Sequence, residues 1–269
     1  MRMHGQGLNK PFKNLIFKSR PVPHFRFPVL SQCAGVYHFI FTRHGGLSEG
    51  NYAQLNVSSN VGDDPQKVAA NLNKIRDTIG ARCLVSMTQV HGDNIVLLHK
   101  GDVVKDTVLG RCDGVVTDAP GVAVMVKLAD CQGVIVFSEE RGVLGISHCG
   151  WRGNVLNILG KLVGVMEKEF ACSAKELRAA IGPSLGPCCG EFKEYREIFP
   201  PAFSRYMVRE NYFDLWAISC HQLMDAGIRA ENIETAEICT KCNEDLFFSY
   251  RANKVTGRFA TVAMLIGEA

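Results

Sequence analysis

Two histidines and one cysteine occupy positions from which they could bind a single metal ion. His91 lies in a loop that interrupts a predicted strand, Cys131 lies just before another strand, and His148 lies just after a third. Two imidazoles and one thiolate form a donor set that zinc uses in catalytic sites, where the fourth position is left for water or substrate. The sequence therefore predicts a metal site at these three residues. Spacing alone leaves open that they are separate buried side chains.

The stretch of residues 128–153 is predicted to bring two of the three together. It contains two apolar runs of strand type, 134–137 and 143–146, separated by a polar turn. In a hairpin, the start of the first strand lies beside the end of the second. We therefore expect Cys131 next to His148.

Three charged residues are candidates for binding or proton transfer around this site. Asp130 precedes Cys131 and suits a base or a partner for a histidine; its alternative is a turn-capping carboxylate. Arg43 follows a strand in a Gly-flanked loop, and Arg152 precedes a glycine near a helix start, so both suit anion binding. A surface ion pair for Arg43 and packing on Trp151 for Arg152 are the alternatives.

The remaining cysteines give no clear metal signal. Cys239 and Cys242 form a C-x-x-C pair, but a zinc ribbon needs a second matched pair, and the adjacent Cys188 and Cys189 lack that spacing. We interpret these cysteines as structural or incidental thiols. The count of 11 cysteines, with no recognisable export signal, predicts reduced, mostly buried thiols in a cytoplasmic protein.

Several motifs that define other classes are absent from the sequence. No His-x-His pair occurs, which argues against a multicopper oxidase architecture, and there is no H-x-E with P-C-x-x-C as in cytidine deaminases. P-loop, Rossmann, G-x-S-x-G and H-E-x-x-H motifs are also missing. A net charge of +3 gives no reason to expect nucleic acid as a partner, and no apolar run approaches the roughly 20 residues of a membrane span.

Strand and helix patterns interleave irregularly along the chain. This order predicts an α/β or α+β domain with mixed sheets rather than a regular βαβ repeat. No internal repeat or linker is visible, so residues 1–269 are predicted to form one domain, with 1–25 as a partly ordered arm. Strands are expected over 36–41, 83–87, 94–99, 112–117, 122–126, 134–137, 143–146, 177–181, 233–238 and 259–266, an extended segment over 247–251, and helices over 65–79, 154–170, 192–199 and 213–226.

Seven motifs, in this order, resemble the YfiH/laccase-domain family of purine nucleoside phosphorylases, which older labels call polyphenol oxidases. The resemblance runs from about residue 36 to the C-terminus. The motifs are TRHGGLSEGNYAQLNVSSNVGDDP, TQVHG, LADC, SHCGWRG, IGPSLGPCC, CTKCNEDLFFSYR and TGRFA.

The resemblance implies an enzyme whose zinc ligands are His91, Cys131 and His148. It implies phosphorolysis of adenosine, inosine and methylthioadenosine to free base and ribose 1-phosphate or its methylthio form, together with deamination of adenosine. As a hypothesis of mechanism for this activity, Arg43 and Arg152 would hold phosphate, and Asp130 or a nearby carboxylate would move a proton. The fold implied is a layered sandwich of mixed β-sheets flanked by helices, acting as a monomer or weak homo-oligomer.

The sequence departs from the family's usual pattern in three of its motifs. Cys149 stands where a small alanine is usual and is expected to add an oxidisable thiol beside the metal. Gln132 and Gly133 stand near a usual proline, and Gly190 replaces a frequent aromatic, which is expected to alter a pocket wall. No departure removes a predicted ligand.

Three other functions fit the same residues. A metal-free hydrolase or deamidase would use Cys131 as nucleophile and His148 as base. A copper-dependent polyphenol oxidase would use the same two histidines and cysteine, since copper also accepts this set, although no nearby Met ligand is evident. A non-catalytic protein on the same fold would leave three metal-binding side chains without a task.

Overall fold

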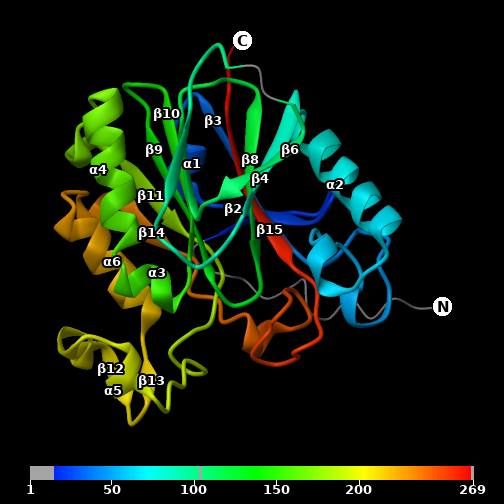
Figure 1. Cartoon of the computed structure of the whole chain (residues 1–269). Helices are drawn as coiled ribbons and strands as arrows, with labels where there is room; N and C mark the ends of the chain where they lie inside the picture. The colour runs from blue at the N-terminus through cyan, green and yellow to red at the C-terminus, as the bar shows by residue number, and fades with distance from the viewer. Residues whose placement is uncertain (1–14, 103–104, 268–269) are drawn as a thin grey trace.

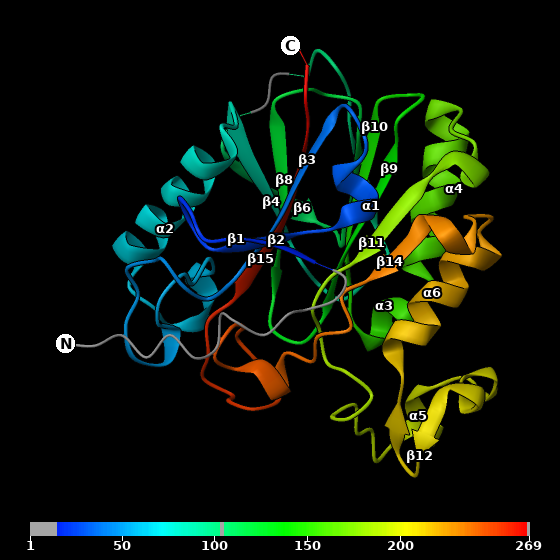
Figure 2. The same ribbon diagram turned by 180° about the vertical axis from the view of Figure 1, so that it is seen from behind.

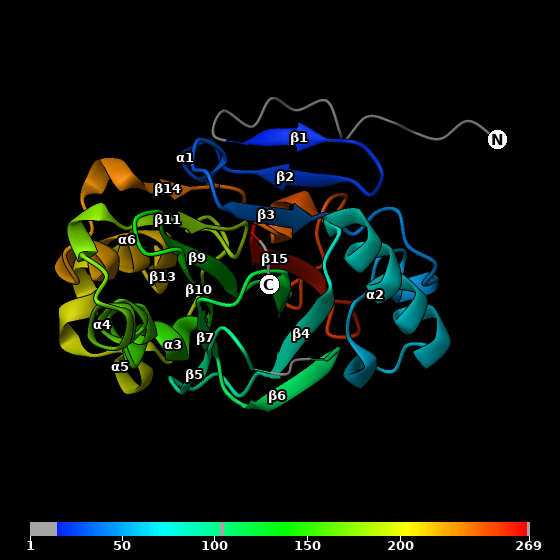
Figure 3. The ribbon, with the colours of Figure 1, turned by 90° about the horizontal axis from the view of Figure 1, so that it is seen from above.

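Two mixed β-sheets lie face to face in this computed structural model, which describes residues 15–102 and 105–267. Helices cover the outer face of each sheet, so the molecule has four layers, as Figure 3 shows from above. The predicted layered sandwich of mixed sheets flanked by helices is therefore confirmed. The N-terminal half of the arm predicted over 1–25 lies outside the described residues, and its remainder includes a short β-hairpin.

The first sheet has seven strands and lies at the right of Figure 1. Its strands β4, β6 and β8 are mutually parallel, and the other neighbours pair antiparallel. In spatial order the strands are β1 (Ile16–Lys18), β2 (His24–Arg26), β3 (Val36–Phe41), β15 (Phe259–Leu265), β8 (Val122–Leu128), β4 (Cys83–Thr88) and β6 (Thr107–Arg111).

The second sheet has six strands, with parallel pairs at its two edges and antiparallel pairs between them. In spatial order the strands are β14 (Ile233–Thr235), β11 (Arg178–Ile181), β9 (Gln132–Ser138), β10 (Val143–Cys149), β7 (Gly114–Thr117) and β5 (Ile95–Leu98). A separate pair, β12 (Met207–Arg209) and β13 (Tyr212–Phe213), lies with the short helix α5 (Tyr195–Ile198) below this sheet, as Figures 1 and 2 show.

The helices divide between the two outer faces. α2 covers the seven-stranded sheet, while α4 and α6 cover the six-stranded one. The helices are α1 (Pro28–Ser31), α2 (Pro65–Ile79), α3 (Trp151–Val155), α4 (Ile158–Phe170), α5 (Tyr195–Ile198) and α6 (Leu215–Asp225), with short 3₁₀ turns η1 (Gly50–Tyr52), η2 (Ser59–Val61), η3 (Ala174–Glu176), η4 (Pro201–Tyr206), η5 (Ala230–Asn232) and η6 (Lys241–Asn243). Among the described helices, none is both long enough and apolar enough to cross a bilayer.

Alternation along the central strands explains the layers. In β9, Ile135 and Phe137 face the core between the sheets, whereas Val134 and Val136 pack against the layer of α4 and α6. Because both faces are covered, the strand is apolar at every inner position instead of alternating with polar residues. Burying each such side chain contributes about 1.5–3 kcal/mol relative to exposure.

The end signals of α2 act as the sequence predicts. The Asp64 side chain accepts a hydrogen bond from the N–H of Gln66, and Pro65 occupies the first helical position. Gly80 ends the helix with a φ of 70°, a left-handed conformation that glycine adopts without steric cost. The predicted helix over 65–79 is confirmed.

Two predictions of local structure are wrong. The single helix expected over 154–170 is divided into α3 and α4, because Asn157 adopts a left-handed conformation and its side chain caps α4 at the N–H of Gly160. The segment 247–251, expected to be extended, contains a bend and a turn, and its groups bind Asp130 in another loop. Strands β1, β2 and β6 were not predicted, because each is short and lies at or next to a sheet edge.

The buried His38 is expected to make the fold sensitive to acid. Its Nε2 accepts a 2.7 Å hydrogen bond from the N–H of Phe27, which requires a neutral ring. Burial, helped by the charge of Arg26, lowers the pKa of His38 from 6.5 to about 3. Between pH 3 and pH 6.5 the His38 ring is protonated in the unfolded chain but not in the native chain. The stability contributed by the neutral ring is therefore present above pH 6.5 and is lost as pH falls toward 3.

We expect His38→Gln, whose amide oxygen can accept the same hydrogen bond, to reduce the dependence of unfolding free energy on pH below 6.5 by about 1.4 kcal/mol per pH unit. Urea denaturation at a series of pH values measures this slope. His99→Gln, at an exposed position, is the control and should keep the original slope. An unchanged slope in His38→Gln would show that His38 is not the group responsible.

Candidate metal centre

The fold brings His91, Cys131 and His148 together. One donor atom from each lies within 4.8 Å of the others. His91 comes from the loop after β4, Cys131 from the turn between β8 and β9, and His148 from the end of β10. His91 is exposed, Cys131 is half-buried and His148 is buried, so the cluster is open on the side of His91. This cluster is a possible metal site.

The predicted β9–β10 hairpin is confirmed, and its register places two of the three residues. His148 pairs with Gly133, which puts Cys131 immediately beyond the paired segment. Within β10, Leu144, Ile146 and His148 share the face toward the other sheet. Cys149 lies on the opposite face, in the core formed with α4. Its thiol is therefore not directed at the centre, although the charge of Cys131 adds to burial in raising the pKa of Cys149.

Asp113 organises this centre, and the sequence analysis missed it. Its Oδ1 lies 2.8 Å from Nδ1 of His148, and the carboxylate also accepts hydrogen bonds from the N–H groups of Val90, His91 and Gly92 at 2.8–3.1 Å. One fully buried carboxylate thus fixes both the ring of His148 and the loop of His91. Its only sequence signal is an Asp-Gly pair before a strand, which is typical of any turn.

The protonation states of this pair follow from their contacts. Burial alone would raise the pKa of Asp113, but the hydrogen bonds from His148, Gly92 and Val90 hold it below its ordinary value. Burial alone would lower the pKa of His148, but the thiolate charge of Cys131 and the bond to Asp113 raise it to about 9. At His91, burial and then the charge of His148 lower the pKa. His91 is therefore neutral at pH 7, as a metal ligand must be.

The donor set fits a divalent metal ion. The hydrogen bond from Nδ1 to a carboxylate leaves Nε2 of His148 as the ligand atom, an arrangement common among metal-binding histidines. Two nitrogens and one sulfur, with an exposed side, match a zinc site that keeps one open position. The same set accepts copper, so the donors alone do not select the metal.

Close backbone approach at Gly150 is a further requirement of the site. A Cβ atom at this position would lie 2.7 Å from Sγ of Cys131, a distance that real Cβ atoms do not tolerate. Gly150 directly precedes α3, so only glycine lets this helix start beside the thiol. The glycine in SHCGWRG therefore has a packing reason in this chain.

Asp130 binds the neighbouring loops. One carboxylate oxygen accepts hydrogen bonds from the hydroxyls of Thr240 and Ser249, both at 2.7 Å, and the other accepts the N–H of Arg251 at 2.6 Å. Its backbone has a φ of 88°, in the left-handed region that non-glycine residues rarely adopt and that is frequent beside functional sites. The side chain thus anchors the turn that presents Cys131.

Arg43 is held against the protein by backbone contacts. Its Nε and Nη1 donate to the carbonyls of Ala53 and Glu244, both at 2.8 Å, and its guanidinium lies 4.4 Å from the ring centre of Phe248. Burial lowers its pKa, against the charges of Glu244 and Asp245. The remaining Nη2 group is the part of this side chain left for an anion.

Two further arginines lie in the electrostatic reach of the centre. Arg152 is exposed, stacks on Trp151 at 5.0 Å, and its charge contributes to the lowered pKa of His91, after burial and the charge of His148. Arg258 is half-buried, and its pKa is lowered by burial against the opposing charges of Cys131 and Asp130. The sequence analysis missed Arg258, although it belongs to the TGRFA motif.

The other two departures from the family's usual pattern have packing explanations. The Gln132 side chain donates to the carbonyl of Leu215 at 2.9 Å and accepts from the hydroxyl of Ser219, which ties α6 to the hairpin. A Cβ at Gly190 would lie 2.6 Å from the carbonyl oxygen of Phe213. A larger residue at Gly190 therefore needs a different path for the β12–β13 unit.

The cysteines outside this centre also gather. Cys188, Cys189, Cys239 and Cys242 have their sulfur atoms within 4.8 Å of one another. The interpretation of the C-x-x-C pair as incidental thiols overlooked this arrangement, because the second pair comes from a loop more than forty positions earlier in the chain. The structure leaves all four as free thiols.

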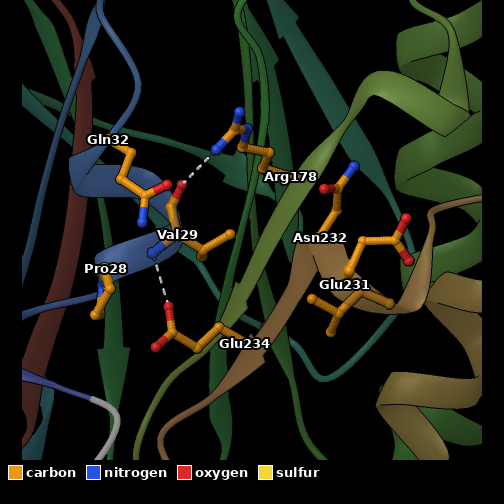
Figure 4. A pocket seen from close by; sticks show the side chains of 8 residues that line it. Pro28, Val29, Gln32, Arg178, Glu231, Asn232 and Glu234 are labelled. Carbon is orange, nitrogen blue, oxygen red and sulfur yellow. Dashed lines mark hydrogen bonds between the residues drawn. The ribbon is translucent and has the colours of Figure 1, made fainter.

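A surface hollow elsewhere in the molecule contains none of the predicted site residues. Figure 4 shows it between α1 and β14, where Glu234 accepts the N–H of Val29 at 2.9 Å and Arg178 donates to the carbonyl of Val29 at 3.4 Å. Two of its three charged side chains, Arg178 and Glu234, are thus engaged with backbone groups. The hollow offers no group suited to the chemistry of the centre at His91.

Curated relatives match most of the chain. It is 32% identical over 240 residues to a purine nucleoside phosphorylase of Bacteroides thetaiotaomicron, covering 82% of this chain and 88% of the relative. It is 33% identical over 243 residues to the purine nucleoside phosphorylase YlmD of Geobacillus stearothermophilus, covering 84% and 88%. These values establish a family relationship across more than four fifths of the chain.

Solved structures agree with this relationship. The YfiH protein of Bacillus licheniformis superposes with a TM-score of 0.83 at 28% identity, covering 93% of this chain and 98% of that one. The family described as multi-copper polyphenol oxidoreductase laccase matches residues 37–266. The curated purine nucleoside phosphorylases and the YfiH structure support the same assignment. The chain therefore belongs to this laccase-domain family.

Proposed function

We propose that the protein is a zinc-dependent purine nucleoside phosphorylase. The observation that carries the proposal is the cluster of His91, Cys131 and His148, open on one side, in a chain whose curated relatives bear that name. Adenosine, inosine and methylthioadenosine are the proposed substrates. The products are the free base and ribose 1-phosphate, or its methylthio form, and adenosine is also deaminated to inosine.

His91, Cys131 and His148 are the proposed metal ligands. When bound there, zinc supplies a Lewis acid for a substrate oxygen or nitrogen and activates water for deamination. Asp113 keeps the Nε2 atom of His148 directed at the ligand position, and its bonds to the backbone of residues 90–92 hold His91 in place. The protein's own contribution is thus a rigid set of donors whose fourth side faces solvent.

Phosphate is the proposed nucleophile, and arginines are its proposed ligands. Arg152 is exposed and close enough to His91 to influence its pKa, so it can bind an anion beside the centre. Arg43 has a free Nη2 group, and we add Arg258, whose charge interacts with Cys131 and Asp130. These cations would hold phosphate in line with the ribosyl carbon while positive charge develops there.

Asp130 is the proposed proton carrier for the departing purine or for deamination. In the structure its two oxygens accept three hydrogen bonds, so proton transfer requires one of these partners to move or to relay the proton. The hydroxyls of Thr240 and Ser249 are suited to such a relay. Without that movement, Asp130 acts as a positioning residue for Cys131.

We also propose a cytoplasmic location and a monomer or weak homo-oligomer. None of the eleven cysteines, all of which lie in the described part of the chain, forms a disulfide, and reduced cysteines are typical of reducing compartments. Size-exclusion chromatography with light scattering measures the oligomeric state.

A screen of nucleosides with and without phosphate tests the activity. We expect chromatography to show hypoxanthine from inosine and adenine from adenosine only when phosphate is present, with some inosine from adenosine in either case. Guanosine, uridine and cytidine complete the screen. Release of no base from any nucleoside by metal-loaded protein would contradict the proposal.

A Cys/His hydrolase remains a second candidate because of one observation. Cys131, His148 and Asp113 form a hydrogen-bonded chain, as in thiol enzymes that use a Cys-His pair and an orienting carboxylate. The raised pKa of His148, which arises against burial from the charge of Cys131 and the bond to Asp113, also fits an imidazolium–thiolate pair. Alkylation distinguishes the two: a metal-bound Cys131 is protected until a chelator is added, whereas a free nucleophile reacts at once.

A further inference from the structure

Four cysteines form a second cluster that shares no residue with the centre at His91. Cys188 and Cys189 follow β11, and Cys239 and Cys242 follow β14. Sγ of Cys242 lies 3.6 Å from Sγ of Cys188 and 3.5 Å from Sγ of Cys189. All four sulfurs lie within 4.8 Å of one another, so they surround a common point.

The spacing of the sulfurs suits a single metal ion. A tetrahedral zinc ion with Zn–S bonds of about 2.3 Å requires sulfur atoms about 3.8 Å apart. Disulfide formation would require a sulfur separation of about 2.05 Å and would use only two of the four thiols. An iron–sulfur cubane binds each thiolate to a different iron atom and therefore needs a wider set of sulfurs.

The backbone around Cys239 is built to hold its sulfur. Ser184 and Cys239 form a parallel bridge, with N–H to carbonyl hydrogen bonds from Thr240 to Ser184 at 3.0 Å and from Ser184 to Ile238 at 3.1 Å. The backbone N–H groups of Gly186 and Cys242 donate to the sulfur of Cys239. Such N–H to sulfur bonds orient and stabilise metal-bound thiolates.

A close approach of the two loops completes this scaffold. A Cβ at Gly186 would lie 3.0 Å from Cβ of Cys239 and 2.8 Å from the ring of Trp216. Glycine therefore allows the loop of Cys188 to pass directly over Cys239.

Cationic groups surround the cluster. Four thiolates around one divalent ion leave a net charge of −2, which nearby cations offset. Arg209 donates from Nη2 to the carbonyl of Cys188 at 3.2 Å, and Lys241 lies in the turn between Cys239 and Cys242. Both carry the sign that a metal-loaded cluster requires.

We propose that Cys188, Cys189, Cys239 and Cys242 bind a structural zinc ion. Four protein ligands leave no open position, which is the coordination of zinc sites that stabilise folds and do not catalyse reactions. Binding replaces four thiol protons with one ion and releases those protons to solvent.

The ion would fasten two loops that support the centre at His91. Thr240, next to Cys239, and Ser249, in the following segment, both donate to Asp130, which adjoins Cys131. The carbonyl of Asp130 accepts the N–H of Leu185 from the loop of the other two cysteines. A metal bound by the four cysteines would thus connect the two loops that hydrogen-bond to Asp130. The inference does not depend on the proposed activity.

Zinc content of the full-length chain tests the site. The protein is reduced, loaded with zinc and dialysed against a weak chelator, and zinc per chain is measured. We expect Cys242→Ser and Cys188→Ser each to lose one ion relative to the unsubstituted chain. Cys131→Ala is expected to lose the other ion and to keep this one. Cys220→Ser, at a partly buried cysteine outside both clusters, is the control and should keep both.

Cobalt gives an independent readout of the ligands. Cobalt-loaded Cys131→Ala should show the intense visible absorption of a tetrahedral four-thiolate complex. Adding Cys242→Ser to this variant should abolish that absorption.

A measurement on the unsubstituted chain tests the site even if the cysteine variants do not fold. Cys188 and Cys242 are exposed, so alkylation reaches them without unfolding. Mass spectrometry should show them protected in the zinc-loaded protein and alkylated at least tenfold faster after zinc removal. Equal alkylation rates, a disulfide within the cluster of freshly reduced protein, or unchanged zinc content in Cys242→Ser would overturn the proposal.

Discussion

Replacing Cys131 with alanine is expected to remove the catalytic metal and nearly all phosphorolysis. The substitution leaves two histidine ligands, one of them exposed, so bound zinc should be lost in dialysis against a weak chelator. A Lewis acid contributes several kcal/mol to transition-state stabilisation, so kcat/KM for inosine should fall on the order of 10³-fold. Zinc analysis and hypoxanthine release, measured on the same sample, check both effects.

Cys149→Ala is the matched control for this experiment. Cys149 lies in the same motif but points into the core with α4, so its loss should lower stability modestly and leave the centre's zinc and the turnover intact. Turnover that persists in Cys131→Ala after its zinc is gone would contradict a role of the metal in the reaction.

Asp113→Asn is expected to weaken metal binding without touching a ligand. The carboxylate accepts four hydrogen bonds, from the ring of His148 and from three consecutive backbone N–H groups. An amide keeps the shape but offers one acceptor oxygen fewer, so the ring of His148 and the loop of His91 cannot both be held. Loss of such a partner costs about 10–100-fold in metal affinity. Competition with a chromophoric chelator measures the zinc affinity.

Asp118→Asn provides the comparison for that result. Asp118 also accepts a backbone hydrogen bond, from the N–H of Lys100, but in the partly buried turn after β7 and not at the centre. The zinc affinity of Asp118→Asn should equal that of the unsubstituted chain. Circular dichroism should show that both variants, Asp113→Asn and Asp118→Asn, are folded. Unchanged zinc affinity in Asp113→Asn would mean that the centre does not depend on this carboxylate.

The hairpin could be predicted from sequence because its information is local. Two apolar runs with a turn between them define β9 and β10, and the register then places Cys131 beside His148. The approach of His91 could not be derived in the same way. It depends on Asp113, which bonds to residues 90–92 on one side and to His148 on the other. An isolated aspartate before a glycine carries no mark of these distant partners.

The predictions for Cys149 and for the four clustered cysteines missed the observed arrangement for a related reason. Adjacent residues of a strand face opposite sides, so Cys149, next to His148 in sequence, directs its thiol to the other face of β10. The two cysteine pairs are brought together by the bridge between Ser184 and Cys239, a pairing of strand ends that no spacing rule describes. The spacing within each cysteine pair therefore gave no indication that the two pairs meet.

Formation of ribose 1-phosphate from inosine is the measurement that tests the account most directly. Phosphorus NMR of the metal-loaded protein with inosine and phosphate should show ribose 1-phosphate appearing in equal amount to hypoxanthine. Both products should disappear when Cys131 is replaced. Hypoxanthine with free ribose and no phosphate dependence would identify a hydrolase instead, and would contradict phosphorolysis at this centre.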